Sequence, residues 1–238
     1  MKIVVGSPKR WTAAKLKIFC ERYKDIEVHA IFEPSELTYE FLSSISPDYV
    51  FFPHWSWRIP QEIYDNFRCI VFHPSDLPFG RGGTPIQNLI ELGFHTTKIS
   101  AIEVGEELDA GGIIMKRDLS LVGTAEEIYL RMQDIVFEDM IPFILTNRPK
   151  AIPQSGNVTV FKRRSPAMSE LKPEMTLEQV FNKIRMLDAE GYPHAFIEFG
   201  GLRLTFTRAS LKTDKIIADV EIVSPVVRSQ GVIEGKYQ

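Results

Sequence analysis

Short apolar runs alternate with amphipathic segments along the first part of the chain. Four of the apolar runs have the length of buried strands, at 3–5, 28–32, 49–52 and 70–72. The segments 12–23 and 36–45 lie between them and carry apolar residues at helical spacing. Strands that alternate with helices in this way predict an α/β fold with a doubly wound, mostly parallel sheet.

The next part of the chain predicts two further strands and a long helix. We expect the strands at 99–104 and 113–116. The helix should begin after Thr124, because Thr124 and Glu127 have the spacing of a capping box. Apolar residues recur at helical spacing from there to about Leu145, which predicts a helix packed against the core.

The polar and apolar pattern changes again after Asn147, which predicts a second, smaller module. We expect a catalytic domain at 1–150, a polar linker at 151–175 and a small α+β module at 176–238. The module should contain one amphipathic helix and three strands, at 176–187, 195–199, 202–206 and 216–222. Gly200-Gly201 predicts a tight hairpin between the first two of these strands.

The segment from Cys69 to Leu89 combines a buried strand with a loop that is rich in glycine and proline. His73 follows the strand directly. Thr84 and Pro85 have the residue types of an N-cap and a first helical position, so a short helix should begin there. Ligands of open α/β sheets bind beyond the carboxyl ends of the strands, so we expect His73 in a binding crevice.

Asp109 opens a second Gly-rich turn, just before an apolar run at 113–115. One interpretation is that its carboxylate hydrogen-bonds the backbone of its own turn. The other is that Asp109 pairs with His73. A histidine that a carboxylate keeps charged can stabilise an oxyanion, while the carboxylate accepts a proton from an amine.

These motifs resemble those of the folate-dependent formyltransferases, and most closely those of the amino-sugar N-formyltransferases. The matching segments are His73-Pro74-Ser75-Asp76-Leu77-Pro78, Arg81-Gly82, Pro85-Ile86-Gln87 and Leu108-Asp109-Ala110-Gly111. The resemblance implies a formyltransferase-like Rossmann-type fold, formyl-tetrahydrofolate as the one-carbon donor and a primary amine as the acceptor. It also implies that His73 and Asp109 are the catalytic residues.

The resemblance assigns further residues to the two ligands. The residues expected to line the folate are His54, Trp55, Ser56, Trp57, Arg58, Leu108 and Gly111. Those expected at the substrate are Ser75, Asp76, Leu77, Pro78, Arg81, Gly82 and Gly83. For Asp76 and Arg81 we favour a role in holding the loop. For the tryptophan loop, residues 53–60, plain hydrophobic packing is an equal alternative. No metal site is expected, because no Cys/His ligand spacing is present.

Val71 departs from the pattern, since the family has an asparagine there that helps to hold the formyl oxygen. Residues two apart on a strand share a face, so Val71 should point into the site beside His73 without a donor. Loss of an oxyanion donor typically costs about 10²- to 10³-fold in rate. His54 and Ser56 are candidates for a substitute donor. The alternatives are a folate- or sugar-binding relative with impaired catalysis, or a hydrolase that releases formate.

Charge narrows the choice of acceptor. The chain of 238 residues has a net charge of -3, and residues 160–238 hold 12 lysines and arginines against 10 acidic residues. This balance gives little attraction for nucleic acid, so a nucleotide-linked amino-deoxysugar is favoured over methionyl-tRNA. No apolar run is long enough for a membrane span, and two cysteines without metal-type spacing favour a reduced, cytoplasmic protein. The oligomeric state, including a homodimer, stays open.

Overall fold

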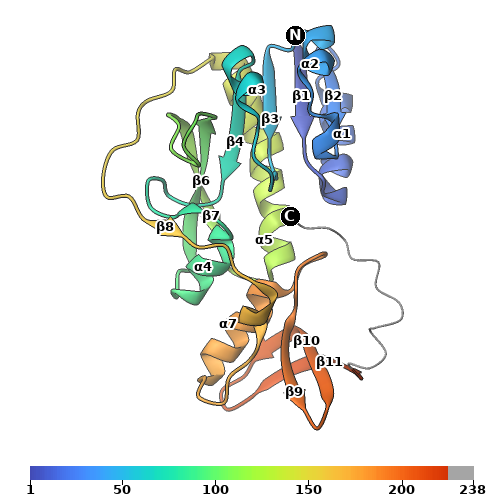
Figure 1. Cartoon of the computed structure of the whole chain (residues 1–238), viewed down its shortest axis with the longest axis vertical. Coiled ribbons are helices and arrows are strands. Elements are labelled where there is room, and N and C mark those ends of the chain that lie inside the picture. The colour runs from blue at the N-terminus through green and yellow to red at the C-terminus, as the bar shows by residue number, and fades with distance from the viewer. Residues whose placement is uncertain (225–238) are drawn as a thin grey trace.

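The computed structural model describes residues 1–224 and shows an α/β layer joined to a smaller α+β module (Figure 1). The strands of the layer are β1 (Lys2–Gly6), β2 (Glu27–Ile31), β3 (Tyr49–Phe52), β4 (Cys69–His73), β6 (Thr96–Glu103) and β7 (Ile113–Ser120). They form one sheet in the order β2-β1-β3-β4-β6-β7. The first four are mutually parallel, whereas β6 and β7 run antiparallel to their neighbours. The predicted doubly wound, mostly parallel sheet is confirmed.

Helices cover both faces of this sheet. One face carries α1 (Arg10–Arg22), α5 (Ala125–Ile135), the π-helical segment η2 (Val136–Met140) and α6 (Ile141–Asn147). The other face carries α2 (Tyr39–Ile45) and α3 (Gln61–Asn66). The single long helix predicted from 125 to 145 is thus three consecutive helical segments, and its capping box at Thr124 is confirmed.

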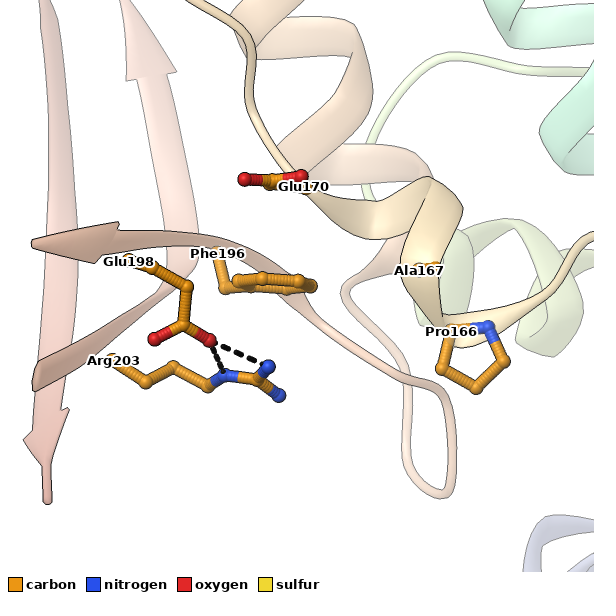
Figure 2. Close-up of a pocket in the computed structure, with 6 residues that line it drawn as sticks. All are labelled: Pro166, Ala167, Glu170, Phe196, Glu198 and Arg203. Carbon is orange, nitrogen blue, oxygen red and sulfur yellow. Dashed lines mark hydrogen bonds and ion pairs between the residues drawn. The ribbon is translucent and has the colours of Figure 1, made fainter. Parts of the chain in front are cut away.

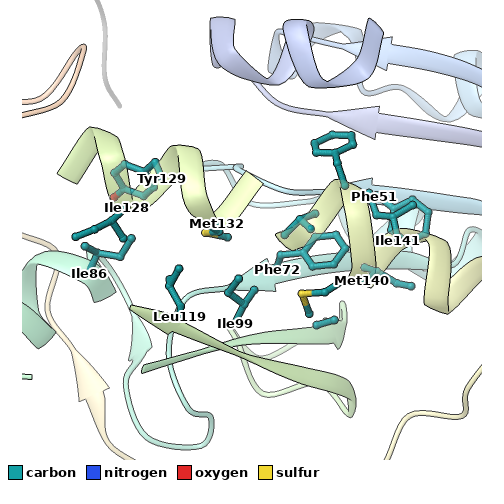
Figure 3. Packing of buried hydrophobic residues seen from close by; sticks show 14 of the residues in the cluster. Phe51, Phe72, Ile86, Ile99, Leu119, Ile128, Tyr129, Met132, Met140 and Ile141 are labelled. Carbon is teal, nitrogen blue, oxygen red and sulfur yellow. The ribbon is translucent and has the colours of Figure 1, made fainter. Parts of the chain in front are cut away.

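The larger hydrophobic core lies between the sheet and the α5–α6 face. Phe51 and Phe72 project from the strands toward Met132, Met140 and Ile141, and all five side chains are buried (Figure 3). A second, smaller cluster packs α2 and α3 onto the opposite face. Because both faces are covered, the ends and edges of the sheet are where the layer can meet a ligand.

The order of the strands reverses between β1 and β3, and ligands of open α/β sheets bind beyond the carboxyl ends of the strands at such a point. Gly6 ends β1 at this point. A Cβ on Gly6 would lie 2.8 Å from the ring of Phe52 and 3.4 Å from that of Trp55. Glycine therefore allows the loop after β3 to fold closely over the end of β1.

The smaller module consists of one helix and an antiparallel sheet. Its elements are α7 (Leu177–Leu187), β9 (Ala195–Phe199), β10 (Leu202–Leu211) and β11 (Ile216–Val223). The strand order is β11-β10-β9, and Gly200 and Gly201 turn the hairpin with positive φ angles, as predicted. Buried Arg185 donates to the carbonyl oxygens of Leu121 and Gly123, which fixes α7 to the α/β layer.

The segment between the two parts runs back along the α/β layer (Figure 1). Its strand β8 (Val160–Phe161) pairs with β5 (Arg81–Gly82), and a 3-10 helix, η3 (Pro166–Ser169), follows. The predicted division at 150 and 175 stays a prediction, but this segment contacts the loop after His73. Residues 225–238 of the predicted module lie outside the described residues. Within residues 1–224, every helix is too short or too polar to cross a bilayer.

The short helix α4 (Pro85–Glu91) begins where the sequence predicts, but Thr84 does not cap it. Thr84 has φ 49° and its side chain makes no cap hydrogen bond. Its hydroxyl instead accepts from the backbone N–H of Arg164, at 3.3 Å, and from the Asn88 amide, at 3.2 Å. The capping role predicted for Thr84 is therefore wrong, because the contact with the β8 segment takes its hydroxyl.

Candidate active site

His73 and Asp109 meet at the carboxyl end of β4, although 35 residues separate them in sequence. His73 is the last residue of β4, and Asp109 lies in the turn between β6 and β7. The Nδ1 atom of His73 is 3.5 Å from Oδ2 of Asp109, and both side chains are largely buried, with 9% and 13% exposed. β6 ends at Glu103, which pairs with Ile70 near the amino end of β4, so the turn after β6 must fold back along β4 to bring Asp109 to His73.

Both ring nitrogens of His73 face acceptors. Nδ1 faces the Asp109 carboxylate, and Nε2 lies 2.7 Å from the carbonyl oxygen of Gly80. A neutral imidazole can donate from only one nitrogen, whereas the imidazolium donates from both. An imidazolium at His73 would therefore have a partner for each of its N–H groups.

Asp109 adopts a left-handed backbone conformation, with φ 54°. Its Oδ2 atom accepts the backbone N–H of Gly82 at 2.8 Å, which ties the turn to the loop after His73. Gly111 follows in the same turn, and a Cβ there would lie 1.7 Å from the carbonyl oxygen of Glu103. The turn therefore requires glycine at position 111, which is a packing reason for the Leu-Asp-x-Gly pattern.

The loop after His73 is held by its own polar groups. Ser75 Oγ donates to the carbonyl oxygen of Gly80 at 3.1 Å, and Ser100 Oγ donates to the carbonyl of Ser75 at 2.7 Å. The side chains of Ser75 and Leu77 are fully buried, and the bond between Leu77 and Pro78 is cis. These residues shape the loop, and a direct substrate contact from them stays a prediction.

Asp76 and Arg81 do not pair with each other. The carboxylate of Asp76 accepts from the ammonium of Lys116, and Arg81 donates from Nε and Nη2 to Oε1 of Gln154, at 3.0 and 2.8 Å. Both side chains thus hold loops in place. Gly83 packs closely against Arg163. A Cβ on Gly83 would be 2.8 Å from the Cα of Arg163.

Gln154 is a site residue that the sequence does not predict. Its amide also donates to the carbonyl oxygens of Asp109 and Gly111, at 2.8 and 2.9 Å. Gln154 lies in the polar segment after the α/β layer, which the sequence predicts to be a linker. The only available sign was its place in a Gln…Gly…Arg-Arg-x-Pro segment.

The row of side chains at Val71 is apolar across three strands. Val71 is paired with Phe52 of β3 on one side and with Ile102 of β6 on the other. Side chains of paired residues point to the same face of a sheet, so no hydrogen-bond donor stands in this row. No neighbouring side chain in this row of the sheet therefore replaces the hydrogen-bond donor of the family's asparagine.

The tryptophan loop follows β3, and its side chains pack on opposite faces of the sheet. His54 packs edge-on against Tyr129, with ring centroids 5.0 Å apart, and against Trp11 at 6.1 Å. Trp55 packs with the cluster on the other face of the sheet, as does Val71. His54 is thus placed away from Val71, which argues against it as the substitute oxyanion donor.

Burial, with a smaller contribution from the ammonium of Lys9, lowers the pKa of His54 to about 3. His54 is therefore neutral at physiological pH. In the same loop, Trp57 is half-buried, and Ser56 and Arg58 are exposed. Leu108 of the Asp109 turn is 70% exposed. Folate contacts for the residues of these two loops stay predictions.

A cavity of about 380 Å³ lies away from this site, between the η3 segment and strands β9 and β10 (Figure 2). It is lined by Pro166, Ala167, Glu170, Phe196, Glu198 and Arg203. None of these residues belongs to the His73–Asp109 site. No group of three or more potential metal ligands occurs within residues 1–224.

Comparison with known proteins gives the same assignment for both parts of the chain. Residues 8–141 match the family described as formyl transferase, and residues 166–223 match the methionyl-tRNA formyltransferase C-terminal domain. A methionyl-tRNA formyltransferase of Streptococcus pyogenes is 27% identical over 223 residues, which cover 87% of this chain and 71% of that protein.

Solved structures extend the similarity. That of a methionyl-tRNA formyltransferase from Clostridium thermocellum is 52% identical, with a TM-score of 0.93, over 94% of this chain and 99% of that one. Aquifex aeolicus HypX, solved in complex with tetrahydrofolic acid, shares the fold at 21% identity and a TM-score of 0.72, over 88% of this chain and 38% of HypX.

A sugar N-formyltransferase from a Shewanella species also shares the fold. Its TM-score is 0.68 at 16% identity, over 90% of this chain and 99% of that one. The match to the formyl transferase family spans more than half of the chain, and it includes His73 and Asp109. The chain therefore belongs to the formyl transferase family and is an enzyme of formyl transfer.

Proposed function

We propose that His73 and Asp109 transfer a formyl group from formyl-tetrahydrofolate to the primary amine of a nucleotide-linked amino-deoxysugar. The observation that carries the proposal is the 3.5 Å approach of a largely buried imidazole and carboxylate at the end of β4. The bound tetrahydrofolate of the Aquifex structure supports a folate as the donor. The substrate amine would enter from the crevice at the carboxyl ends of the strands.

The reaction forms one C–N bond and breaks another. The amine nitrogen attacks the formyl carbon, and the formyl oxygen becomes an oxyanion. The His73 imidazolium stabilises this oxyanion, for which Nε2–H must exchange the Gly80 carbonyl for the substrate oxygen. Asp109 accepts a proton from the attacking amine, and the tetrahedral intermediate then releases the folate nitrogen, which is protonated by His73.

Trp55 is our candidate for the donor that the family's asparagine would supply. Its indole N–H is buried and has no hydrogen-bond partner within residues 1–224. Trp55 packs with the same cluster as Val71, at the end of the neighbouring strand. A buried donor without a partner is costly, so its retention calls for an explanation. The assignment requires a movement of the ring that turns this N–H toward the formyl oxygen.

The choice of acceptor molecule depends on the positive charges of residues 160–224. Residues 160–224 contain ten lysines and arginines. Six are engaged: Arg164 and Lys183 with Glu91, Lys172 with Glu170, Arg203 with Glu198, Arg208 with Asp219, and Arg185 with two carbonyls. Proteins bind nucleic acid largely through lysines and arginines that contact its phosphates. Four remaining cations favour a nucleotide over a tRNA.

The test is a comparison of initial rates with formyl-tetrahydrofolate as the donor. One reaction contains a nucleotide-linked 4-amino-4-deoxysugar or 3-amino-3-deoxysugar, and the other contains methionyl-tRNA. We expect kcat/KM to be at least tenfold higher with one of the amino sugars. A higher value with methionyl-tRNA would overturn the acceptor proposal while leaving formyl transfer in place.

Two alternatives follow from Val71. A chain that binds tetrahydrofolate without turnover on any amine would be a binding relative, because its apolar row leaves the formyl oxygen unsupported. Release of formate from formyl-tetrahydrofolate without an acceptor would indicate a hydrolase. The cytoplasmic location and the homodimer stay predictions, which fractionation and mass measurement in solution would decide.

A further inference from the structure

The side-chain amide of Gln154 uses its full hydrogen-bonding capacity on two elements of the active site. Both N–H groups of Nε2 are engaged, by the carbonyl oxygens of Asp109 at 2.8 Å and Gly111 at 2.9 Å. Oε1 accepts from Nε and Nη2 of Arg81, at 3.0 and 2.8 Å. Gln154 therefore joins the turn that carries Asp109 to the loop that follows His73.

Apart from Gln154, the Asp109 turn is held by the Gly82 N–H, which the Asp109 carboxylate accepts at 2.8 Å, and by the Glu103 N–H, which donates to the Gly112 carbonyl. Residues 105–108 are exposed, so no buried side chain holds this part of the turn in the core. Asp109 itself has φ 54°, a conformation that is unfavourable for a residue with a Cβ. A turn of this kind keeps its shape only when contacts from outside it hold the backbone. The two hydrogen bonds from Gln154 are contacts of that kind, and they fall on Asp109 and on Gly111.

Arg81 fixes the direction of the Gln154 amide. A guanidinium has donors and no acceptor, so only the amide oxygen can face it. The NH₂ group must then face the two carbonyl oxygens of the turn. A glutamate at this position would keep the interaction with Arg81, but it would lose both donors and place an oxygen against two carbonyls.

We propose that Gln154 is a positioning residue for Asp109. By holding the carbonyl groups on either side of Ala110, it keeps Oδ2 of Asp109 directed at Nδ1 of His73. Arg81 acts one step further out, by orienting the amide. The inference rests on the roles proposed above for His73 and Asp109. It also makes the segment that follows the α/β layer a part of the active site, so this segment is more than a tether for the C-terminal module.

The first test compares three variants of the full chain. Gln154→Met keeps the side-chain volume and removes every hydrogen bond, and Gln154→Glu removes only the two donors. Asn157→Ala is the matched control, because Asn157 is exposed in the same segment and its side chain makes no hydrogen bond within residues 1–224. We expect both Gln154 variants to lower kcat about 10- to 100-fold with KM for formyl-tetrahydrofolate within twofold of the wild type.

A second readout does not depend on the acceptor. Nitrogen NMR of His73 reports whether Nδ1–H faces a carboxylate, and it needs no turnover. We expect Gln154→Met to change the His73 ring signals and their pH titration toward those of Asp109→Asn, while Asn157→Ala leaves them unchanged. Wild-type His73 signals in a folded Gln154→Met variant would overturn the inference, because Asp109 would then hold its place without the amide.

The outcomes separate this inference from the proposed function. If Asp109→Asn retains wild-type turnover, the catalytic roles proposed for the pair fail, whatever Gln154 does. If Asp109→Asn is impaired and Gln154→Met is not, the positioning role alone fails. If both are impaired, the double variant should lose no more than twofold beyond Asp109→Asn, because Gln154 acts through Asp109.

Discussion

The carboxylate of Asp109 accepts the backbone N–H of Gly82 at 2.8 Å, so the turn between β6 and β7 is bonded directly to the loop after His73. The same carboxylate oxygen faces His73. Three segments thus converge on one carboxylate: the end of β4, its following loop and the β6–β7 turn. A backbone contact therefore helps to position the proposed catalytic pair.

The turn should not tolerate a side chain at position 111. We expect Gly111→Ala to lower kcat more than tenfold and to destabilise the fold by about 1–3 kcal/mol, because its Cβ would overlap the carbonyl oxygen of Glu103. Gly105→Ala is the control, since no atom lies within 4 Å of a Cβ built there. Thermal unfolding and initial rates of the two variants check this. Equal effects from both substitutions would contradict it.

Restoring the family's asparagine tests whether the apolar row limits the reaction. If no group replaces the missing donor, Val71→Asn should raise kcat about 10- to 100-fold, since one oxyanion donor is worth about 10²- to 10³-fold. If Trp55 supplies the donor, Val71→Asn should have little effect, and Trp55→Phe should lower kcat instead. A higher kcat in Val71→Asn, with no loss in Trp55→Phe, would show that no group replaces the donor. A lower kcat in Trp55→Phe, with no gain in Val71→Asn, would show that Trp55 supplies it.

His54 should make the fold sensitive to mild acid. Its pKa is about 3 in the folded chain, against about 6.5 when unfolded, so the unfolded state binds a proton first as the pH falls. Stability from this residue is present above pH 6.5 and is lost toward pH 3. Between pH 7 and pH 5 the free energy of unfolding should fall by about 2 kcal/mol.

The measurement for His54 is urea unfolding at the two pH values, for the wild type and for His54→Gln. The variant cannot take up this proton, so its change between pH 7 and pH 5 should be about 2 kcal/mol smaller. The same change in both proteins would show that other groups cause the acid sensitivity.

The two cysteines should react at different rates with a thiol reagent. Burial raises the pKa of the Cys69 thiol to about 12, and Cys69 lies within β4, whereas Cys20 is exposed on α1. One thiol per chain should react in buffer and two in denaturant. Mass spectrometry of the labelled chain should place the fast label on Cys20, and labelling of Cys69 in the folded protein would contradict this burial.

Much of the fold follows from the sequence because its elements have strong local signals. The strand at 49–52 and the helix beginning after Thr176 coincide with the predicted ranges, since each is a clear apolar run or a capped amphipathic segment. The two-residue strands β5 and β8 were not predictable, because they have no hydrophobic period of their own. Their pairing arises only when the segment after α6 folds back on the α/β layer.

Some residues of the site are likewise predictable from the sequence, and others are not. His73 and Asp109 follow from motifs at strand ends, and the turn between β6 and β7 brings them together. Gln154 was not, because its role depends on the path of a polar segment that has no regular structure at that point. The capping role predicted for Thr84 failed for a related reason, since the segment that takes its hydroxyl is far away in sequence.

A double-mutant comparison of formyl transfer tests whether His73 and Asp109 act as a pair. The rate of formyl transfer to the preferred amine is measured for the wild type, His73→Gln, Asp109→Asn and the double variant, each checked for folding by circular dichroism. We predict that each single change lowers kcat about 10²- to 10⁴-fold and that the double variant loses little more than either single one, because the two residues act as a pair. Wild-type rates in either single variant would contradict the account.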